Sequence, residues 1–99
     1  MNYYFCKLVP PRADFAQTLT PAEMSAMQAH AAYWKQKAKD NIAIAVGLVA
    51  DPKGFYGVGI VEVADETQLK AILDNDPAIT ANVGLKYEFY PFARGVIHR

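Results

Sequence analysis

Hydrophobic residues gather in four short segments that favour β-structure. Residues 2–9 are rich in aromatic side chains and end at two prolines, as expected of a strand. Two apolar runs flank the sequence DPKG at 51–54, which is typical of a type I turn, so residues 42–64 predict a hairpin. A weakly alternating segment closes at Pro91. The predicted strands are residues 2–9, 42–50, 55–64 and 85–92.

A long helix is predicted between the first two strands. Thr20 is a good N-cap, Pro21 suits the first helical position, and Glu23 completes a capping box. The helix should run to about Asn41. Its apolar stripe has spacings of three and four and consists of Met27, His30, Trp34 and Ala38.

A shorter helix is predicted between the third and fourth strands. Asp65 is its N-cap, Gln68 follows three residues later, and the helix should end near Asn75. Its buried stripe consists of Leu69, Ile72 and Leu73. Before the first helix, residues 12–19 are expected to form a polar loop.

The predicted order is strand, helix, strand, strand, helix, strand. In one antiparallel four-stranded sheet, this βαββαβ order gives an α+β, ferredoxin-like fold with both helices on one face. The chain has 99 residues without a repeat or a linker, so we expect one domain over residues 1–99.

The predicted hairpin is apolar on both faces. One alternating set comprises Ile42, Ile44, Val46 and Leu48, and the other comprises Ala43, Ala45 and Val49. A sheet with one solvated face should instead alternate apolar and polar residues. Because two helices cannot cover both faces, we expect the helix-free face to pack on a second copy of the chain, giving a homodimer. The alternative is a monomer whose loops fold over that face.

Composition excludes several classes of partner. Ten basic and ten acidic residues leave a net charge of zero, and no basic run could neutralise a series of phosphates, so we expect no nucleic-acid partner. The longest apolar run has about half the length of a bilayer-spanning helix, so no membrane segment is expected. The single cysteine, Cys6, cannot form an internal disulfide, and no leader pattern is visible, which predicts a cytoplasmic protein.

Histidine is the side chain best suited to change charge near neutral pH, and the chain has two. His98 is the penultimate residue and is expected to be solvated. His30 lies on the apolar stripe of the first helix, where a buried imidazole needs a hydrogen-bonding partner, and a satisfied core histidine is the simpler interpretation. Asp76 is a candidate partner, although aspartate before proline is an ordinary cap and Asp51 has the same setting. No clustered metal ligands are present, so no metal site is expected.

Four motifs stand out together: AH at 29–30, AVGLVAD at 45–51, DNDPAITANVG at 74–84 and YPF at 90–92. With them, the chain resembles the YciI-like (YCII-related) family of small ferredoxin-like proteins that dimerise into an α+β barrel. The likeness spans roughly residues 2–97.

The resemblance implies that His30 and Asp76 face a pocket between the helices and the sheet. The aspartate would hold the imidazole in one tautomer and favour its protonated form, and the other ring nitrogen would move a proton at a small-molecule substrate. The implied activity is a lyase-type removal of chloride from a hydroxylated aromatic ring, without a metal or an organic cofactor.

The chain departs from the family pattern at two positions. Family members often have an arginine where this chain has Met27, and a proline where it has Leu48. Losing a fixed cation favours a less charged ligand, unless Lys7, Arg12 or Arg94 supplies the charge. The expected substrate contacts are Tyr4, Tyr33, Trp34, Phe92 and Arg94, although each aromatic residue also suits the core.

Two other functions remain open from the sequence. A noncatalytic module could hold a metabolite or a protein partner with the same barrel, and a neutral, buried His30 would favour it. An oxygen-dependent monooxygenase on the related dimeric barrel would need a different pocket pattern, which the first helix does not show.

Overall fold

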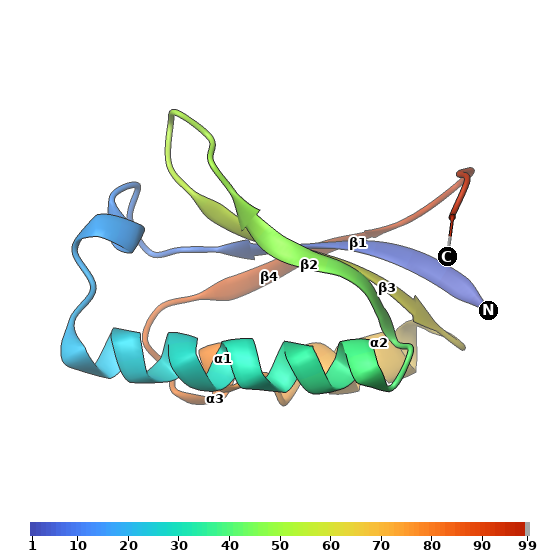
Figure 1. The fold of residues 1–99 in the computed structure, drawn as a ribbon, viewed down its shortest axis with the longest axis horizontal. Helices are drawn as coiled ribbons and strands as arrows, with labels where there is room; N and C mark the ends of the chain where they lie inside the picture. The colour runs from blue at the N-terminus through green and yellow to red at the C-terminus, as the bar shows by residue number, and fades with distance from the viewer. Residues whose placement is uncertain (99) are drawn as a thin grey trace.

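The fold is a four-stranded antiparallel sheet with helices packed on one face (Figure 1). The computed structural model describes residues 1–98. The strands are β1 (Asn2–Val9), β2 (Ala43–Val49), β3 (Tyr56–Val63) and β4 (Lys86–Pro91), in the order β2-β3-β1-β4. The helices are α1 (Pro21–Lys39), α2 (Glu66–Asp74) and the short α3 (Pro77–Thr80), and η1 (Phe15–Gln17) is a 3-10 turn. The predicted α+β, ferredoxin-like fold is confirmed.

Local capping fixes where the two longer helices begin. The Thr20 hydroxyl accepts the N–H of Glu23 at 3.1 Å, and the Glu23 carboxylate accepts the N–H of Thr20 at 2.8 Å, which is the predicted capping box. Asp65 caps α2 as expected. The helix α1 ends at Lys39, slightly earlier than predicted, where Asn41 takes a left-handed conformation with φ of 61°. Within residues 1–98, no helix has both the length and the apolarity that crossing a bilayer requires.

The core lies between the helices and the inner face of the sheet. Alternate residues of β1 point inward, so Cys6 is fully buried, and burial raises the pKa of its thiol to about 12. The thiol is therefore protonated and has a structural role. The buried core cluster consists of Tyr4, Cys6, Trp34, Ala43, Val61, Val63, Leu69, Ile72 and Leu73.

The strand β2 departs from its predicted alternation. A register shift between Ala43 and Ala45 interrupts the pairing with β3. Ala43 is consequently buried in the core, and Val46 and Leu48 face the same side of the sheet. The expected division into an even-numbered and an odd-numbered face is therefore wrong for this strand, because one extra residue at the irregularity moves Ala43 to the helix-covered side.

The segment before α1 is mostly exposed, as expected of a polar loop, but it contains a short helical turn and one buried aromatic side chain. Residues 12–19 contain η1, and Phe15 within it is only 6% exposed. A large aromatic side chain gains most when it is removed from water, and it draws this loop against the body of the domain. The prediction of a polar loop over residues 12–19 therefore fails only at Phe15.

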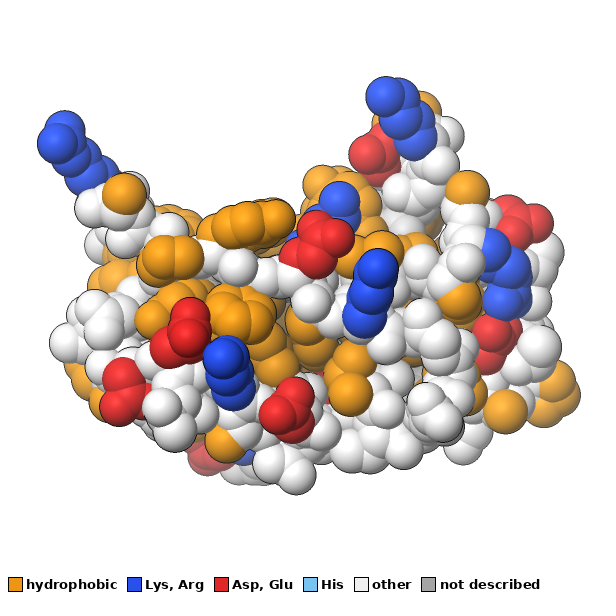
Figure 2. Space-filling view, turned by 180° about the vertical axis from the view of Figure 1, so that it is seen from behind, with side chains coloured by type: hydrophobic (Ala, Val, Ile, Leu, Met, Phe, Trp, Pro, Cys, Tyr) orange, Lys and Arg blue, Asp and Glu red, His pale blue; other side chains and the backbone are white. Residues whose placement is uncertain are grey.

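The helix-free face of the sheet is largely apolar. Figure 2 shows hydrophobic side chains gathered in a hollow between the β2–β3 hairpin and the C-terminal residues. Cross-strand register places Tyr3, Phe5, Ala45, Val49, Tyr56, Val58, Ile60 and Tyr90 on this face. Tyr90 is 57% exposed. This is the face that the sequence predicts to pack on a second copy of the chain.

Candidate functional site

Asp76 begins the short helix α3 and is completely buried. Its Oδ1 accepts the N–H of Ala78 at 2.9 Å, and Pro77 occupies the first helical position. The exposed fraction of Asp76 is 0%. A buried carboxylate needs several donors, because removing an unpaired charge from water costs several kcal/mol.

Three side chains from two other elements supply those donors. Nδ1 of His30 lies 2.8 Å from Oδ2 of Asp76 and 3.0 Å from Oδ1, and Nε1 of Trp34 donates to Oδ2 at 2.9 Å. His30 and Trp34 are four residues apart on α1, so they project from the same side of the helix. From β4, the Tyr87 hydroxyl donates to Oδ2 at 2.5 Å. The carboxylate thus joins α1, α3 and β4 in one hydrogen-bonded cluster.

The ionised form of Asp76 is favoured in this cluster. Burial by itself raises the pKa of the carboxyl, but the hydrogen bonds from His30, Tyr87, Trp34 and Ala78 more than offset burial, and the pKa lies below its usual value. Burial, together with the nearby Asp76 charge, raises the pKa of the Tyr87 hydroxyl, which keeps its proton. Asp76 is therefore a hydrogen-bond acceptor only.

An ionised partner fixes the tautomer of His30. Because the carboxylate has no proton to give, the hydrogen shared between the two groups belongs to Nδ1. Nε2 is then the ring nitrogen left for a ligand, and the His30 side chain is 15% exposed. The sequence predicts this pairing, and the catalytic role of the two residues stays a prediction.

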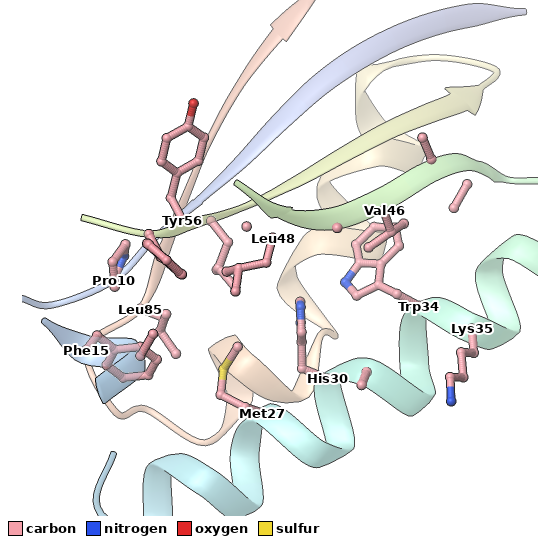
Figure 3. Close-up of a pocket in the computed structure, with 18 of the residues that line it drawn as sticks. Pro10, Phe15, Met27, His30, Trp34, Lys35, Val46, Leu48, Tyr56 and Leu85 are labelled. Carbon is pink, nitrogen blue, oxygen red and sulfur yellow. The ribbon is translucent and has the colours of Figure 1, made fainter. Parts of the chain in front are cut away.

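His30 lines an apolar cleft of about 630 Å³ between α1 and β2. Figure 3 shows its ring rising from α1 toward the strands, between Met27 and Trp34. The opposite wall includes Val46 and Leu48, which are 43% and 63% exposed. All four residues of the predicted helix stripe line this cleft, namely Met27, His30, Trp34 and Ala38. The volume falls within the roughly 300–1,000 Å³ of small-molecule sites.

The residues expected to contact a substrate do not converge on this cleft. Trp34 lines it, whereas Tyr4 is buried in the core. Tyr33 donates its hydroxyl to a carbonyl oxygen of α2 at 2.7 Å. Phe92 and Arg94 lie in the segment after β4, outside the residues that line the cleft.

Tyr87 is a member of the cluster that the sequence interpretation missed. It pairs with Leu8 of β1, and both side chains face the helices. A tyrosine at an inward strand position buries a hydroxyl that needs a partner, and this is the signal that could have identified it. Phe15 and Leu19 were also missed as cleft residues, because they lie in the segment expected to be a polar loop.

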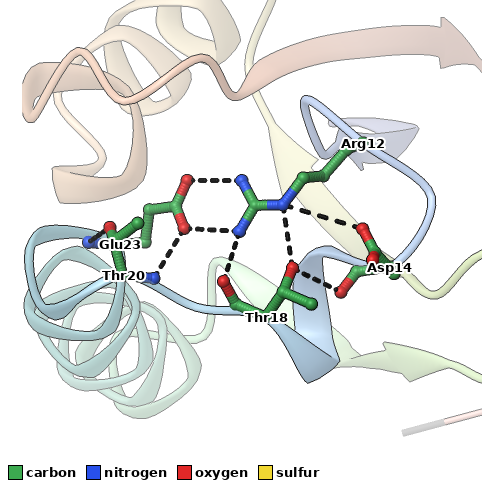
Figure 4. Close-up of polar contacts among 5 residues, drawn as sticks. All are labelled: Arg12, Asp14, Thr18, Thr20 and Glu23. Carbon is green, nitrogen blue, oxygen red and sulfur yellow. Dashed lines mark hydrogen bonds and ion pairs between the residues drawn. The ribbon is translucent and has the colours of Figure 1, made fainter.

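Two of the three candidate cations are used elsewhere. Arg12 donates from Nη1 and Nη2 to the Glu23 carboxylate at 2.8 and 2.7 Å, and from Nε to the Thr18 hydroxyl at 2.9 Å (Figure 4). Lys7 lies 4.4 Å from the centroid of the Tyr56 ring. Neither side chain is among those lining the cleft.

The chemistry available at the site is proton transfer at Nε2 of His30. Across the described residues 1–98, no group of three or more histidine, cysteine or acidic side chains is placed to hold a metal ion. An imidazole held by a buried carboxylate and facing an apolar cleft can accept a proton and return it.

Comparison with known proteins agrees with the fold and the motifs. A family model described as the YCII-related domain matches residues 4–93. The match runs from β1 through β4 and includes His30 and Asp76. A search of curated proteins finds no match to the chain.

Proposed function

The chain belongs to the YCII-related family, and from that premise and the geometry around His30 we propose that it is an acid–base enzyme acting on a small molecule. The reaction would be of the lyase type, with dehydrochlorination of a hydroxylated ring as the first case to test. His30 would move the proton, Asp76 would orient the ring, and no metal or organic cofactor would take part.

One observation carries the proposal: the ring nitrogen Nδ1 is bound by a buried carboxylate, while the same ring borders a cleft large enough for a ligand. On a chlorinated hydroquinone, Nε2 of His30 would first carry a proton from one ring hydroxyl to the chlorine-bearing carbon, so that one C=O bond forms and that carbon becomes tetrahedral. Nε2 would then take the proton of the second hydroxyl, and the electron pair of that O–H bond would form the second C=O bond as a ring double bond shifts to the chlorine-bearing carbon. Chloride would leave with the electrons of the carbon–chlorine bond. Asp76 would stabilise the imidazolium until it returns the proton to water.

The test is halide release from a panel of chlorinated hydroquinones. We expect His30→Ala and Asp76→Asn to lower the rate by at least about 100-fold, the range typical of a lost acid–base group. His98→Ala and Asp51→Asn are matched controls, because they change the same residue types outside the cleft, and they should retain the rate. Circular dichroism checks that each variant is folded. A panel turned over equally well by folded His30→Ala would contradict the proposal.

A noncatalytic binding module is the second candidate, favoured by the apolar lining of the cleft. In that case a ligand would raise the thermal midpoint with the logarithm of its concentration over its dissociation constant, without any product forming. Screening phenols, halogenated aromatics and lactones by thermal shift, followed by product analysis of each hit, separates the two functions.

We also propose that the protein is a homodimer through the helix-free face of the sheet. The apolar side chains of that face support it, since burying several hundred Å² would contribute on the order of ten kcal/mol at about 25 cal/mol per Å², before the costs of association. Light scattering at micromolar concentration should give the mass of two chains. A mass of one chain would overturn this part of the proposal.

A further inference from the structure

We propose that the cleft selects an elongated, electrically neutral ligand, with one hydrogen-bonding group at His30 and an apolar body extending to the loop wall. We use the name loop wall for residues 10–19. The inference rests on the proposed function only for the group that meets His30. Its support comes from the lining of the cleft and the contacts that fix the loop wall.

The lining offers a ligand almost no polar contact besides His30. The apolar side chains include Leu8, Pro10, Phe15, Leu19, Met27, Val46, Leu48, Phe55 and Leu85. Three other lining residues carry polar atoms, and none is directed at a ligand beside His30. Nε1 of Trp34 is bound to Asp76, and Figure 3 shows the Lys35 amine and the Tyr56 hydroxyl turned away from His30.

An anionic ligand would lose its hydration in this cleft without gaining a fixed cation. Burying an unpaired charge costs several kcal/mol, whereas a neutral molecule exchanges water for apolar contacts. The cleft lining contains one lysine, Lys35, and Figure 3 shows its amine turned away from His30. Outside the lining, Arg12 is already paired with Glu23, and Lys7 lies over Tyr56. The lining therefore discriminates against negative charge.

Part of the cleft lining is β3 backbone without a side chain, at Gly57. Gly57 and Gly59 face the helices, opposite Leu8 and Cys6 of β1. A Cβ placed on Gly57 would lie only 3.2 Å from Cβ of Leu8. A side chain at this position would have to displace Leu8, so glycine keeps the packing between β1 and β3 close at the edge of the cleft.

The loop wall gives the cleft its length, and Arg12 fixes it in place. Phe15 and Leu19 both line the cleft, and Figure 3 shows Phe15 at the end away from Trp34. The Arg12 guanidinium lies 5.2 Å from the centroid of the Phe15 ring and donates to the Thr18 carbonyl at 2.6 Å. Its paired hydrogen bonds to Glu23 tie all of this to the first turn of α1 (Figure 4).

Glu23, the buried partner of Arg12, carries a negative charge at neutral pH. Glu23 is 6% exposed, and the hydrogen bonds from Arg12 and from the backbone of Thr20 lower the pKa of its carboxyl to about 2. Because the guanidinium and the carboxylate share two parallel hydrogen bonds, their relative orientation is fixed. The loop wall is therefore a fixed surface for an apolar body.

The experiment compares two fluorescent probes with one skeleton. N-phenyl-1-naphthylamine is neutral, and 1-anilinonaphthalene-8-sulfonate adds a single negative charge. We expect the full-length protein to bind the neutral probe at least tenfold more tightly. Met27→Arg places a cation in the cleft one turn before His30, so it should weaken the neutral probe and strengthen the anionic one.

Met24→Arg is the matched control, because it makes the same change on α1 at a residue that is 48% exposed and outside the cleft lining. It should leave the ratio of the two affinities unchanged. If Met27→Arg does not fold, Leu48→Arg introduces the cation from the opposite wall at an exposed position. Equal affinity for both probes in the unmodified protein, or equal effects of Met24→Arg and Met27→Arg, would overturn the inference.

The result is separable from the test of the proposed function. If the protein does not prefer the neutral probe but halide release still depends on Asp76, the inference about the ligand is wrong and the proposed reaction stands. If the protein clearly prefers the neutral probe but turnover does not depend on His30, the proposed reaction is wrong and the inference about the ligand stands.

Discussion

Asp51 and Asp76 both precede a proline, and both accept a backbone N–H from the residue two positions ahead at 2.9 Å. Beyond this shared turn geometry, the two sites differ. Asp51 lies in the β2–β3 hairpin with part of its surface in water, whereas Asp76 is 0% exposed and accepts from three further side chains.

The difference shows how tertiary contacts change an ordinary capping motif. Local chemistry is the same at both dipeptides, because a short carboxylate before proline suits a turn or a helix start. Asp76 differs because α1 and β4 pack beside it and place a histidine, a tryptophan and a tyrosine within hydrogen-bonding distance of its Oδ2 atom. Tertiary packing turns a local cap into the centre of a buried hydrogen-bonded cluster.

The largest expected effect is on stability at these two positions. Asp76→Ala removes the acceptor of buried donors on Trp34, Tyr87 and Ala78, so it should lower the free energy of unfolding by about 3–5 kcal/mol. Asp51→Ala removes one partly solvated hydrogen bond and should cost about 1 kcal/mol or less. Urea unfolding of both variants measures the contrast, and equal losses would contradict the comparison.

The next largest effect is the difference in stability lost when a tyrosine hydroxyl is removed from a charged acceptor or from a neutral one. Tyr87→Phe deletes a hydrogen bond to the ionised Asp76 and should cost about 1.5–3 kcal/mol. Tyr33→Phe deletes a hydrogen bond to a backbone carbonyl and should cost about 0.5–1.5 kcal/mol. The same unfolding measurement ranks them, and a larger loss at Tyr33 would show that the Asp76 cluster is not the stronger site.

A smaller effect is the acid dependence of stability. The folded-state pKa of Asp76 lies below its unfolded value, so its contribution is complete above about pH 4 and is lost as the pH falls through the folded-state pKa. Glu23 behaves in the same way down to about pH 2. Each of Asp76→Asn and Glu23→Gln should make the unfolding free energy less sensitive to pH in this window. Chemical unfolding at stepped pH measures it, and an unchanged slope in both variants would refute the assignment.

Local sequence patterns predict much of the fold. The capping box at Thr20 and the turn at 51–54 depend on neighbouring residues, so the sequence predicts them well. His30 and Asp76 are 46 residues apart in the sequence, so no local pattern predicts their contact. The helix stripe and the family resemblance together predict it.

Other features depend on contacts that no local pattern contains. The register shift at Ala43 is set by pairing with β3, and the position of Phe15 is set by the space beside α1. Tyr87 joins the cluster only because β4 lies beside β1 at the sheet edge near α3. Residue type predicts Tyr4 and Phe92 as substrate contacts, but residue type does not determine the direction in which a side chain points.

The most direct test of the central claim is the protonation of the His30 ring, observed by long-range ¹H–¹⁵N correlation in isotopically labelled protein. Because an ionised Asp76 faces Nδ1, we predict that Nδ1 keeps its proton from pH 5 to pH 8 and that only Nε2 responds to added ligand. A ring whose Nδ1 is bare while Nε2 carries the proton would contradict the account.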